Sequence, residues 1–257
     1  MSKPPLAEFA LVVVHTFNER EALERLVKLI LQQPAPLHIL VINDNSSDGT
    51  GQSADQLARQ DNRVQVFHRS RKMGLGSAYR LGCEYALRSD YGWMVTMNAD
   101  FSHNPRYIPQ LLALARANDL AIGSRYAPEG GSTGSNRIHS TLSRNINRII
   151  RKLLRLTPVD CTSRFRCYPD YVLQQIHPET IAGDRYSFLV ETLVRCAKRE
   201  FRVGEMPFIY DDRRLVPARS LRSDSRSACA IFRLWFKRWH LGRWPLAHPK
   251  QSDGPVL

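Results

Sequence analysis

The hydrophobic pattern changes period repeatedly over the first half of the chain, from short apolar runs to stretches with one apolar face. The apolar, β-branched runs predict strands, and the amphipathic stretches between them predict helices. Strands that alternate with helices form mostly parallel sheets with right-handed crossovers, so we predict an α/β fold. The predicted strands are 9–14, 37–42, 63–68, 93–97 and 119–124, and the predicted helices run to about 33, near 51–60, within 72–90 and at about 105–118.

Clusters of polar residues follow three of the predicted strands. They lie around Asn18, from Asn43 to Asp48, and from Asn98 to His103. In open α/β sheets, ligands bind outside the carboxyl ends of the strands. We therefore expect these three clusters to converge in space, although they are far apart in the sequence.

The pattern changes after Gly130, where a Gly/Ser loop leads into a strongly basic helix at 141–156. A further helix is predicted at about 188–199 and a strand near 201–210, followed by a tail rich in Trp, Arg and Lys. In the basic helix, Leu142, Ile146, Ile149, Ile150 and Leu153 mark one face, and Arg144, Arg148, Arg151, Lys152 and Arg155 mark the other.

Two interpretations of this basic helix are open. Its charged face could be solvated while its apolar face packs on the core. Alternatively, the helix could lie on an anionic lipid surface, with its long basic side chains reaching to the head groups. The tail favours the second interpretation, because Trp prefers membrane interfaces.

The composition indicates a folded protein with anionic partners. Apolar residues make up 43% of the 257 residues, which allows a sizeable core and argues against wholesale disorder. Lys and Arg number 37 against 24 acids, a net charge of +13. Such an excess favours nucleic acid, phosphorylated substrates or an acidic membrane surface, and charge alone does not choose among them.

The cysteines and the lengths of the apolar runs indicate where in the cell the protein is expected. The five cysteines are scattered and include no CxxC pair, which argues against a zinc site and a disulfide framework and fits a reducing cytosol. The first residues lack the apolar core of a signal peptide. No run approaches the roughly 20 apolar residues of a membrane-spanning helix. We expect a cytoplasmic protein that meets a membrane, if at all, from its surface.

Eight motifs occur in a specific order: HTFNERE, VINDNSSDGT, RKMGLGSAY, MNADFSHNP, GSRY, VDCTSRFR, YSFLVE and MPFIYDDR. In that order they resemble the polyprenyl-phosphate (dolichol-phosphate) mannosyltransferases, which are family 2 glycosyltransferases of the GT-A fold. The resemblance covers about 12–213. It implies one GT-A domain over 7–215, with a nucleotide-sugar half at 7–126 and an acceptor half at 127–215, followed by a basic, Trp-rich helical extension at 216–257.

The resemblance implies transfer of a sugar, mannose from GDP-mannose, to a polyprenyl phosphate at the cytosolic membrane face, with inversion. A phosphate acceptor is already anionic near neutral pH, so the reaction needs no strong general base. It needs in-line positioning and neutralisation of the departing diphosphate, usually by Mg²⁺ or Mn²⁺. Because such cations prefer oxygen ligands, Asp100 and the amide oxygen of Asn98 are the candidate metal ligands.

The resemblance also assigns roles to other residues. The catalytic residues would be Asp100, Arg125 and Arg213. The acceptor phosphate would lie near Ser163, Arg166 and Glu191, in and after the segment that begins at Asp160. The nucleotide-sugar would be held by Thr16, Asn18, Glu19, Asn43, Asp44, Arg71, Lys72, Asn98 and Ala99.

The chain departs from the family pattern at several of these positions. The family usually has Pro at the position of His15, Asp at those of Asn43 and Asn98, and a small residue at that of Arg164. An amide keeps the size and one oxygen of an acid but loses its charge, so affinity for a hard cation should fall. The chain could therefore be an active transferase, or a weakened relative that binds nucleotide-sugar or lipid without turnover.

A third function, nucleic-acid binding, rests on the net charge alone. The sequence shows no helix-turn-helix pattern, no zinc ligands and no aromatic RNA-binding strand, so we expect no nucleic acid partner. The sequence does not identify a membrane-anchoring partner.

Several of these residues also have a simpler interpretation. Asp100 could cap the helix that enters near Pro105. His103 is more typical of a structural hydrogen-bonding residue than of a metal ligand, and His15 of a loop residue. Glu191 could be a buried helix acid paired with an arginine. The GLG segment could be a tight turn before a helix, since the full G-x-G-x-x-G pattern is absent.

Overall fold

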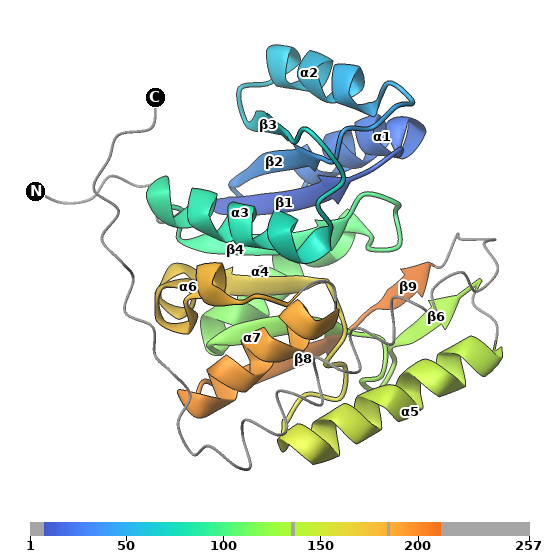
Figure 1. Cartoon of the computed structure of the whole chain (residues 1–257), viewed down its shortest axis with the longest axis vertical. Helices are drawn as coiled ribbons and strands as arrows, with labels where there is room; N and C mark the ends of the chain where they lie inside the picture. Colours follow the sequence, from blue (N-terminus) through green and yellow to red (C-terminus); the bar gives the residue numbers. More distant parts are fainter. Residues whose placement is uncertain (1–7, 135–136, 184–185, 212–257) are drawn as a thin grey trace, which may run out of the picture.

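The structure is a computed structural model that describes residues 8–134, 137–183 and 186–211 (Figure 1). The predicted extension at 216–257 and the predicted catalytic residue Arg213 lie outside the described residues.

A seven-stranded sheet forms the centre of the molecule, in the order β3-β2-β1-β4-β7-β5-β8, and β6 and β9 form a separate parallel pair. All neighbours in the main sheet are parallel except β7, which runs antiparallel to both β4 and β5. The strands are β1 (Ala10–Thr16), β2 (Leu37–Asn43), β3 (Val64–His68), β4 (Trp93–Asn98), β5 (Leu120–Ser124), β6 (Gly131–Thr133), β7 (Arg166–Pro169), β8 (Val203–Pro207) and β9 (Ile209–Asp211).

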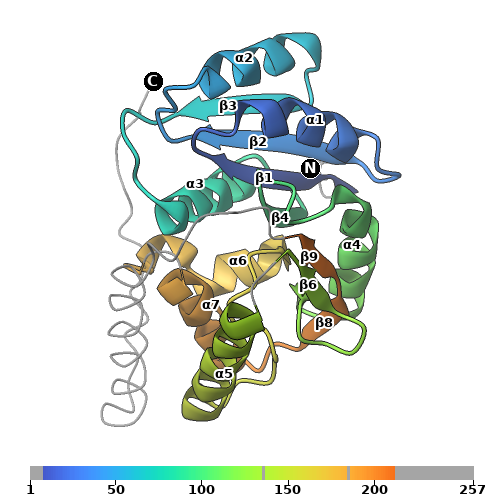
Figure 2. The same ribbon diagram turned by 90° about the vertical axis from the view of Figure 1, so that its right-hand side faces the viewer.

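Helices cover both faces of the sheet (Figure 2). The apolar residues of α1, α2 and α4 pack into one core, and those of α3, α6 and α7 into a second core on the opposite face. The helices are α1 (Arg20–Leu31), α2 (Thr50–Gln60), α3 (Leu75–Arg88), α4 (Ile108–Ala117), α5 (Arg137–Leu154), α6 (Asp170–Ile176) and α7 (Tyr186–Lys198), with short 3-10 helices η2 (Pro105–Tyr107) and η3 (Pro178–Thr180).

The predicted mostly parallel α/β fold is therefore confirmed, although several elements differ from those predicted. The segment predicted as one strand near 201–210 forms two strands, β8 and β9, in different sheets. The antiparallel strand β7 was not predicted. It is short and begins with Arg166, which is fully buried, so the sequence there shows no apolar run.

Close packing around β1 fixes the position of α3. A Cβ atom added to Gly82 would lie 2.8 Å from Val13 Cγ1, so the helix can approach the central strand only without a side chain there. Gly74, just before α3, has φ 86°, a conformation that glycine adopts without strain. The GLG segment thus forms a tight turn that starts the helix.

Helix α5 has its apolar row on the surface. Leu142, Ile146, Ile149 and Leu153 are 53%, 42%, 57% and 41% exposed. Of the apolar residues predicted to share one face, Ile150 is the exception, since it is buried in the core that α3 and α7 also line. The interpretation in which the apolar row packs on the core is therefore wrong. Within the described residues, no helix has the length and apolar composition needed to cross a membrane.

Candidate functional site

The polar clusters after β1, β2 and β4 meet at one edge of the sheet, as predicted. In the strand register, Thr16 lies beside Asn43 and His15 beside Asn98. Asn18 has φ 56°, in the left-handed region that Asn tolerates. Its side-chain oxygen accepts the N–H of Ser47 at 2.9 Å, which ties the first loop to the second.

Asp44, predicted to contact the nucleotide, is fully buried and held by three groups. His15 Nε2 lies 2.8 Å from its Oδ2, the Gly74 N–H donates to the same oxygen at 3.2 Å, and Arg69 forms an ion pair with the carboxylate. Burial alone would raise the pKa of Asp44, but the bond to His15 and the charge of Arg69 hold that pKa below its ordinary value. His15 therefore belongs to β1 and binds Asp44, and its prediction as a loop residue is wrong.

The sequence did not identify Arg69 as a residue of the site. It is buried, and its guanidinium also donates to Ser77 Oγ at 2.6 Å and to the Gly74 carbonyl at 3.1 Å. Only an indirect argument could have identified Arg69. A carboxylate that is buried at a strand end requires a cation close by. Arg69 opens the basic segment that follows β3, and the prediction chose Arg71 and Lys72 from that segment instead.

Asn43 makes three hydrogen bonds, in one of which an aspartate could not take its place as donor. Its Oδ1 accepts from the backbone N–H and the hydroxyl of Ser46 at 3.3 and 2.6 Å, and its Nδ2 lies 3.2 Å from His68 Nδ1. Because Nδ1 accepts this bond, a neutral His68 carries its proton on Nε2, which lies 2.8 Å from Asp55 Oδ1. In this arrangement the amide donates to the histidine, a role that a carboxylate cannot take.

Asn98 and Asp100 share one hydroxyl. Ser102 donates its backbone N–H to Asp100 Oδ1 at 3.1 Å, and its hydroxyl contacts the same oxygen. Asn98 Nδ2 lies 2.8 Å from Ser102 Oγ. A hydroxyl has one proton, which the carboxylate attracts, so Ser102 must accept from Asn98. This directs the side-chain oxygen of Asn98 away from Ser102. Ala99, between Asn98 and Asp100 in the sequence, is buried.

His103 packs beneath this loop. Its Nδ1 accepts the Asn98 N–H at 3.1 Å, and its ring stacks on Phe165 with centroids 5.1 Å apart. Burial lowers the pKa of His103 to about 3, although the charge of Asp100 acts in the opposite direction. His103 is therefore neutral and has the structural hydrogen-bonding role that the sequence favoured.

A buried ion pair faces the loop from the other side of the site. Arg125 Nε and Nη2 donate to Asp160 Oδ2 and Oδ1 at 2.7 and 2.8 Å, and Nη2 also donates to Thr162 Oγ1 at 2.9 Å. Burial alone would raise the pKa of Asp160, but the charge and hydrogen bonds of Arg125 hold it below its ordinary value. Burial alone would lower the pKa of Arg125, but Asp160 raises it. Both groups therefore stay charged.

A cleft of about 50 Å³ lies between the two loops. The sequence predicted some of its residues but not Tyr186, Tyr210 or Arg164, which was noted only as a departure from the family pattern. The Arg164 guanidinium lies 5.6 Å from the centre of the Tyr186 ring. The cleft is lined by Asn98, His103, Arg125, Thr162, Ser163, Arg164, Tyr186 and Tyr210.

Arg166, predicted to bind the acceptor phosphate, lies in the core with no exposed surface. Its guanidinium donates at 2.8 Å to each of three backbone carbonyls, those of Ser163, Leu189 and Cys161. In this arrangement Arg166 holds the chain around the cleft and does not face into it.

The other two predicted acceptor residues, Ser163 and Glu191, lie in different parts of the structure. Ser163 lines the cleft, and its hydroxyl donates to the Gly123 carbonyl at 2.6 Å. Glu191 is buried on α7 and forms an ion pair with Arg195 at 2.7 Å, as in the simpler interpretation of this acid. Ser163 is thus the one predicted acceptor residue that the structure brings to the cleft.

The remaining nucleotide-side residues surround the end of β1. Thr16 is buried, and its hydroxyl makes no hydrogen bond within the described residues. Glu19 precedes the first turn of α1. Lys72 places its Nζ 3.6 Å from the centre of the Phe17 ring, and Arg71 is exposed. Arg71 and Lys72 are exposed, whereas Thr16 is buried, and the structure brings none of these side chains into the cleft.

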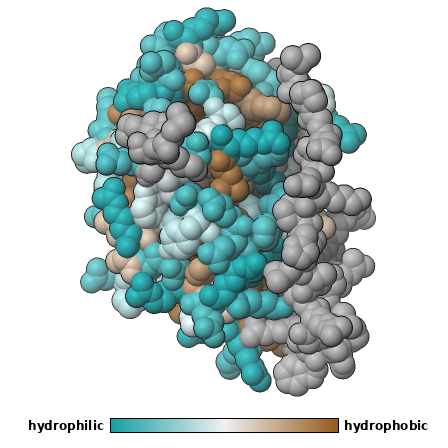
Figure 3. Space-filling view, turned by 90° about the vertical axis from the view of Figure 1, so that its left-hand side faces the viewer, coloured by the Kyte–Doolittle hydropathy of each residue, from teal (hydrophilic) through white to brown (hydrophobic). Residues whose placement is uncertain are grey.

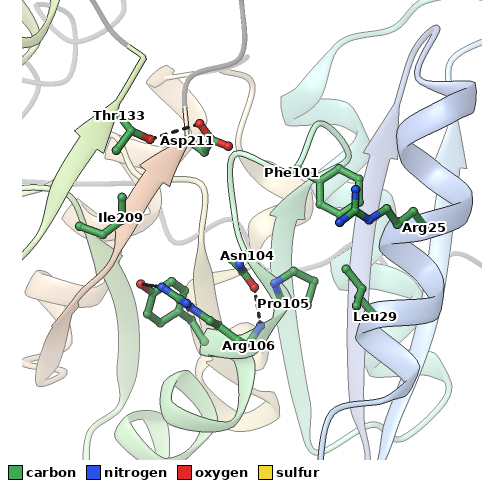
Figure 4. Close-up of a pocket in the computed structure, with 10 residues that line it drawn as sticks. Arg25, Leu29, Phe101, Asn104, Pro105, Arg106, Thr133, Ile209 and Asp211 are labelled. Carbon is green, nitrogen blue, oxygen red and sulfur yellow. Dashed lines mark hydrogen bonds between the residues drawn. The ribbon is translucent and has the colours of Figure 1, made fainter.

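A second cleft, of about 260 Å³, lies beside the loop of Asp100, between α1 and the β6–β9 pair (Figure 4). Arg25 lies 5.4 Å from the centre of the Phe101 ring, and Arg106 lies 4.8 Å from that of Tyr107. This cleft is the larger, yet it contains none of the predicted site residues. We therefore place the chemistry at the smaller cleft, where charged and polar groups from five segments converge.

The oxygen groups of the loop fit a divalent cation that is mainly held by a substrate. In the part of the chain that the structure describes, no three His, Cys, Asp or Glu side chains cluster to form a complete metal site. Mg²⁺ is commonly bound by one or two carboxylates together with phosphate oxygens and water. Asp100 and the side-chain oxygen of Asn98 would supply the protein part of such a site.

Comparison with known proteins identifies the family. Residues 11–176 match the model of glycosyl transferase family 2. The chain belongs to this family. It is 37% identical over 235 residues to polyprenol monophosphomannose synthase of Mycolicibacterium smegmatis, covering 91% of this chain and 89% of that protein. It is 35% identical over 205 residues to undecaprenyl-phosphate mannosyltransferase of Micrococcus luteus, covering 80% of this chain and 84% of that protein.

Solved structures confirm the GT-A fold. Glucosyl-3-phosphoglycerate synthase of Mycobacterium tuberculosis, in complex with Mn²⁺, uridine diphosphate and phosphoglyceric acid, superposes with a TM-score of 0.66 at 15% identity, covering 89% of this chain and 78% of that one. The same enzyme with Mg²⁺ and uridine diphosphate gives a TM-score of 0.64 at 15% identity, covering 89% and 79%. The protein is thus a family 2 glycosyltransferase similar to mannosyltransferases.

The buried His103 makes stability depend on pH. In the unfolded chain its pKa is near the ordinary 6.5, while in the folded protein it is about 3, so the unfolded state binds the extra proton between these values. The free energy of unfolding should therefore fall as pH drops below 6.5, by up to about 1.4 kcal/mol per pH unit from this residue.

Urea unfolding at about pH 5 and about pH 7 measures this dependence. His103→Phe keeps a stacking ring but cannot titrate, so its free energy of unfolding should fall less steeply with pH, even if it is lower throughout. Equal slopes for the two proteins would contradict the buried, neutral assignment.

Asn98→Asp should make the stability of the protein depend on divalent cations. Two carboxylates would then compete for the single proton of Ser102, so the melting temperature should fall without metal. A bound cation offsets this repulsion, and Mn²⁺ should raise the melting temperature of the variant more than that of the natural protein.

Asn43→Asp is the matched control, because it also replaces a buried amide with an acid but lies in the other hydrogen-bonded group, with His68. The melting temperature of Asn43→Asp should also fall, and Mn²⁺ should raise it no more than it raises that of the natural protein. Identical Mn²⁺ responses of the two variants would remove Asn98 from the metal site.

Proposed function

We propose that the protein transfers mannose, with inversion, from GDP-mannose to a polyprenyl phosphate at the cytosolic face of a membrane. The observation that carries this proposal is the composition of the cleft: an amide from the loop of Asp100 on one side, two arginines on the other, and no available general base among the described residues that line it. The mannosyltransferase relatives support the choice of sugar and acceptor.

The donor would bind at the ends of β1, β2 and β4. Asp100 and Asn98 would hold Mg²⁺ or Mn²⁺, which supplies positive charge to the departing diphosphate. Arg71 and Lys72, at the surface beside the same strand ends, would add to that charge. Asp44 would orient the nucleoside through the loop that it anchors, since its own carboxylate is already bonded to His15 and Arg69.

The acceptor would bind in the cleft through its phosphate. The charge of Arg125 is balanced by Asp160, so Arg164 gives the cleft its excess positive charge. The one histidine of the cleft is neutral and already hydrogen-bonded at Nδ1. A hydroxyl acceptor would need a base to remove its proton, whereas a phosphate oxygen attacks without one. The absence of a base from the described cleft residues therefore favours a phosphate acceptor.

A transfer assay tests the proposal. The full chain is incubated with polyprenyl phosphate and a panel of labelled nucleotide-sugars, with and without Mn²⁺, and label is measured in the organic phase. We expect labelled lipid from GDP-mannose in the presence of Mn²⁺. No labelled lipid from any donor, while calorimetry still shows nucleotide binding, would support the non-catalytic alternative instead.

Asp100→Asn should lower the rate of this reaction by about 100-fold or more, because it removes the one carboxylate that holds positive charge at the developing diphosphate. The substitution keeps the size of the side chain, so the melting temperature should change little. Calorimetry with Mn²⁺ and GDP should show weaker metal binding. Full activity of the variant would refute the metal assignment.

Arg164→Gln should raise the KM for polyprenyl phosphate by about 10- to 100-fold, the loss expected for one hydrogen bond to a charged group. The KM for the nucleotide-sugar should stay unchanged. Arg59→Gln, an exposed arginine on α2, is the control and should alter neither KM. Equal loss of affinity for both substrates would place Arg164 outside the acceptor site.

A further inference from the structure

The surface of α5 carries a continuous apolar row. Leu142, Ile146, Ile149 and Leu153 follow one another at steps of four, three and four residues, so they lie on one side of the helix. Single exposed apolar residues are common on protein surfaces and need no explanation. A row along one helix instead marks a site of interaction with a protein or a membrane.

Positive charge lies on a second exposed face of α5, around the helix from this row. The sequence of α5 contains no Asp or Glu. Arginine and lysine have long apolar stems, so their charged ends can reach lipid head groups while the stems stay beside apolar side chains. Five basic residues on the helix and at its end are exposed: Arg144, Arg148, Arg151, Lys152 and Arg155.

A third side of α5 is fixed to the cleft. Ile150 and Leu154 are buried in the core, and Asn147 donates to Thr162 Oγ1 at 3.0 Å. Thr162 lines the cleft and is also bonded to Arg125. A helix is about 10–12 Å thick with its side chains, so the apolar row lies about one helix diameter from the cleft.

We infer that the apolar row of α5 docks on an anionic lipid bilayer and holds the cleft at the level of the lipid phosphates. This inference rests on the proposed function, because it explains how a lipid phosphate reaches Arg164. A second copy of the chain fits the row poorly, since α5 carries exposed basic residues and no acid, so two such helices would repel each other. An anionic bilayer supplies both the apolar layer and the negative charge.

The position of α5 suits such docking. It lies at the end of the molecule opposite α2 and β3 in both ribbon views (Figures 1 and 2). The face turned away from the viewer of Figure 2 is mostly hydrophilic, with apolar side chains in separate patches (Figure 3). Phe67 on β3 is 44% exposed and has no such row, which makes it a suitable control.

Vesicle binding tests the inference. The full chain is sedimented with vesicles of phosphatidylcholine alone and of phosphatidylcholine with phosphatidylglycerol. We expect binding to the anionic vesicles that weakens with added salt. Leu142→Gln/Ile149→Gln should reduce this binding by at least about tenfold, because two apolar side chains no longer enter the lipid. Glutamine is a good helix former, so α5 should persist, which unchanged circular dichroism and melting temperature would show.

Phe67→Gln should bind the vesicles as the natural protein does. Undiminished vesicle binding by the double variant would overturn the inference. So would a natural protein that is dimeric by light scattering and becomes monomeric in the double variant, because the row would then be covered by a second copy. Equal binding to neutral and anionic vesicles would overturn the choice of an anionic surface.

An activity comparison separates this inference from the proposed function. The double variant should transfer mannose normally to a short, water-soluble polyprenyl phosphate and at least about tenfold more slowly to a long-chain acceptor in vesicles. Equal losses with both acceptors would overturn the docking role. If the natural protein transfers sugar to neither acceptor, the proposed function fails, while vesicle binding still decides whether α5 docks.

Discussion

The buried ion pair between Arg125 and Asp160 is the interaction on which the site depends. Arg125 follows β5, and Asp160 belongs to the loop that leads to β7. That loop is also held by Glu205 of β8, whose carboxylate accepts the N–H groups of Val159 and Asp160 at 2.7 and 3.0 Å. Removing one member of such a buried pair costs about 3–5 kcal/mol, because the other charge is left without a partner. The cleft therefore keeps its shape only while both charges are present.

The same ion pair connects the cleft to helix α5 at the surface. Thr162 receives a bond from Arg125 and another from Asn147, so the end of β5, the loop before β7 and α5 form one hydrogen-bonded unit. Tyr126, the neighbour of Arg125, adds a second link through its hydroxyl, which lies 2.7 Å from Ser143 Oγ. A helix held in this way has little freedom to turn, so its apolar row keeps a fixed direction relative to the cleft.

The sequence predicted the elements whose patterns arise from burial alone. β1 is apolar because both of its faces are covered, and the residues after β1, β2 and β4 meet because parallel strands end at the same edge. It could not predict side-chain partners that depend on tertiary structure. An arginine in the VDCTSRFR motif can bind a phosphate or three carbonyls, and only the fold shows that Arg166 does the second and that Arg164 faces the cleft. Four of the five apolar residues predicted to share one face of α5 do share it, but Ile150 lies on a buried side, and periodicity does not show which side of a helix is covered.

The hydroxyl of Ser102 makes positions 98 and 102 interdependent. With a single proton to give, it suits one acid and one amide, so an acid at position 98 is favourable only with a second donor nearby or with a cation held constantly in place. Substitutions at these two positions should therefore be non-additive, and related sequences should vary them together. In a relative, an acidic residue at position 98 therefore indicates different hydrogen-bond donors around the loop as well as a stronger ligand. Introducing that acid alone into this chain would not reproduce the relative's site.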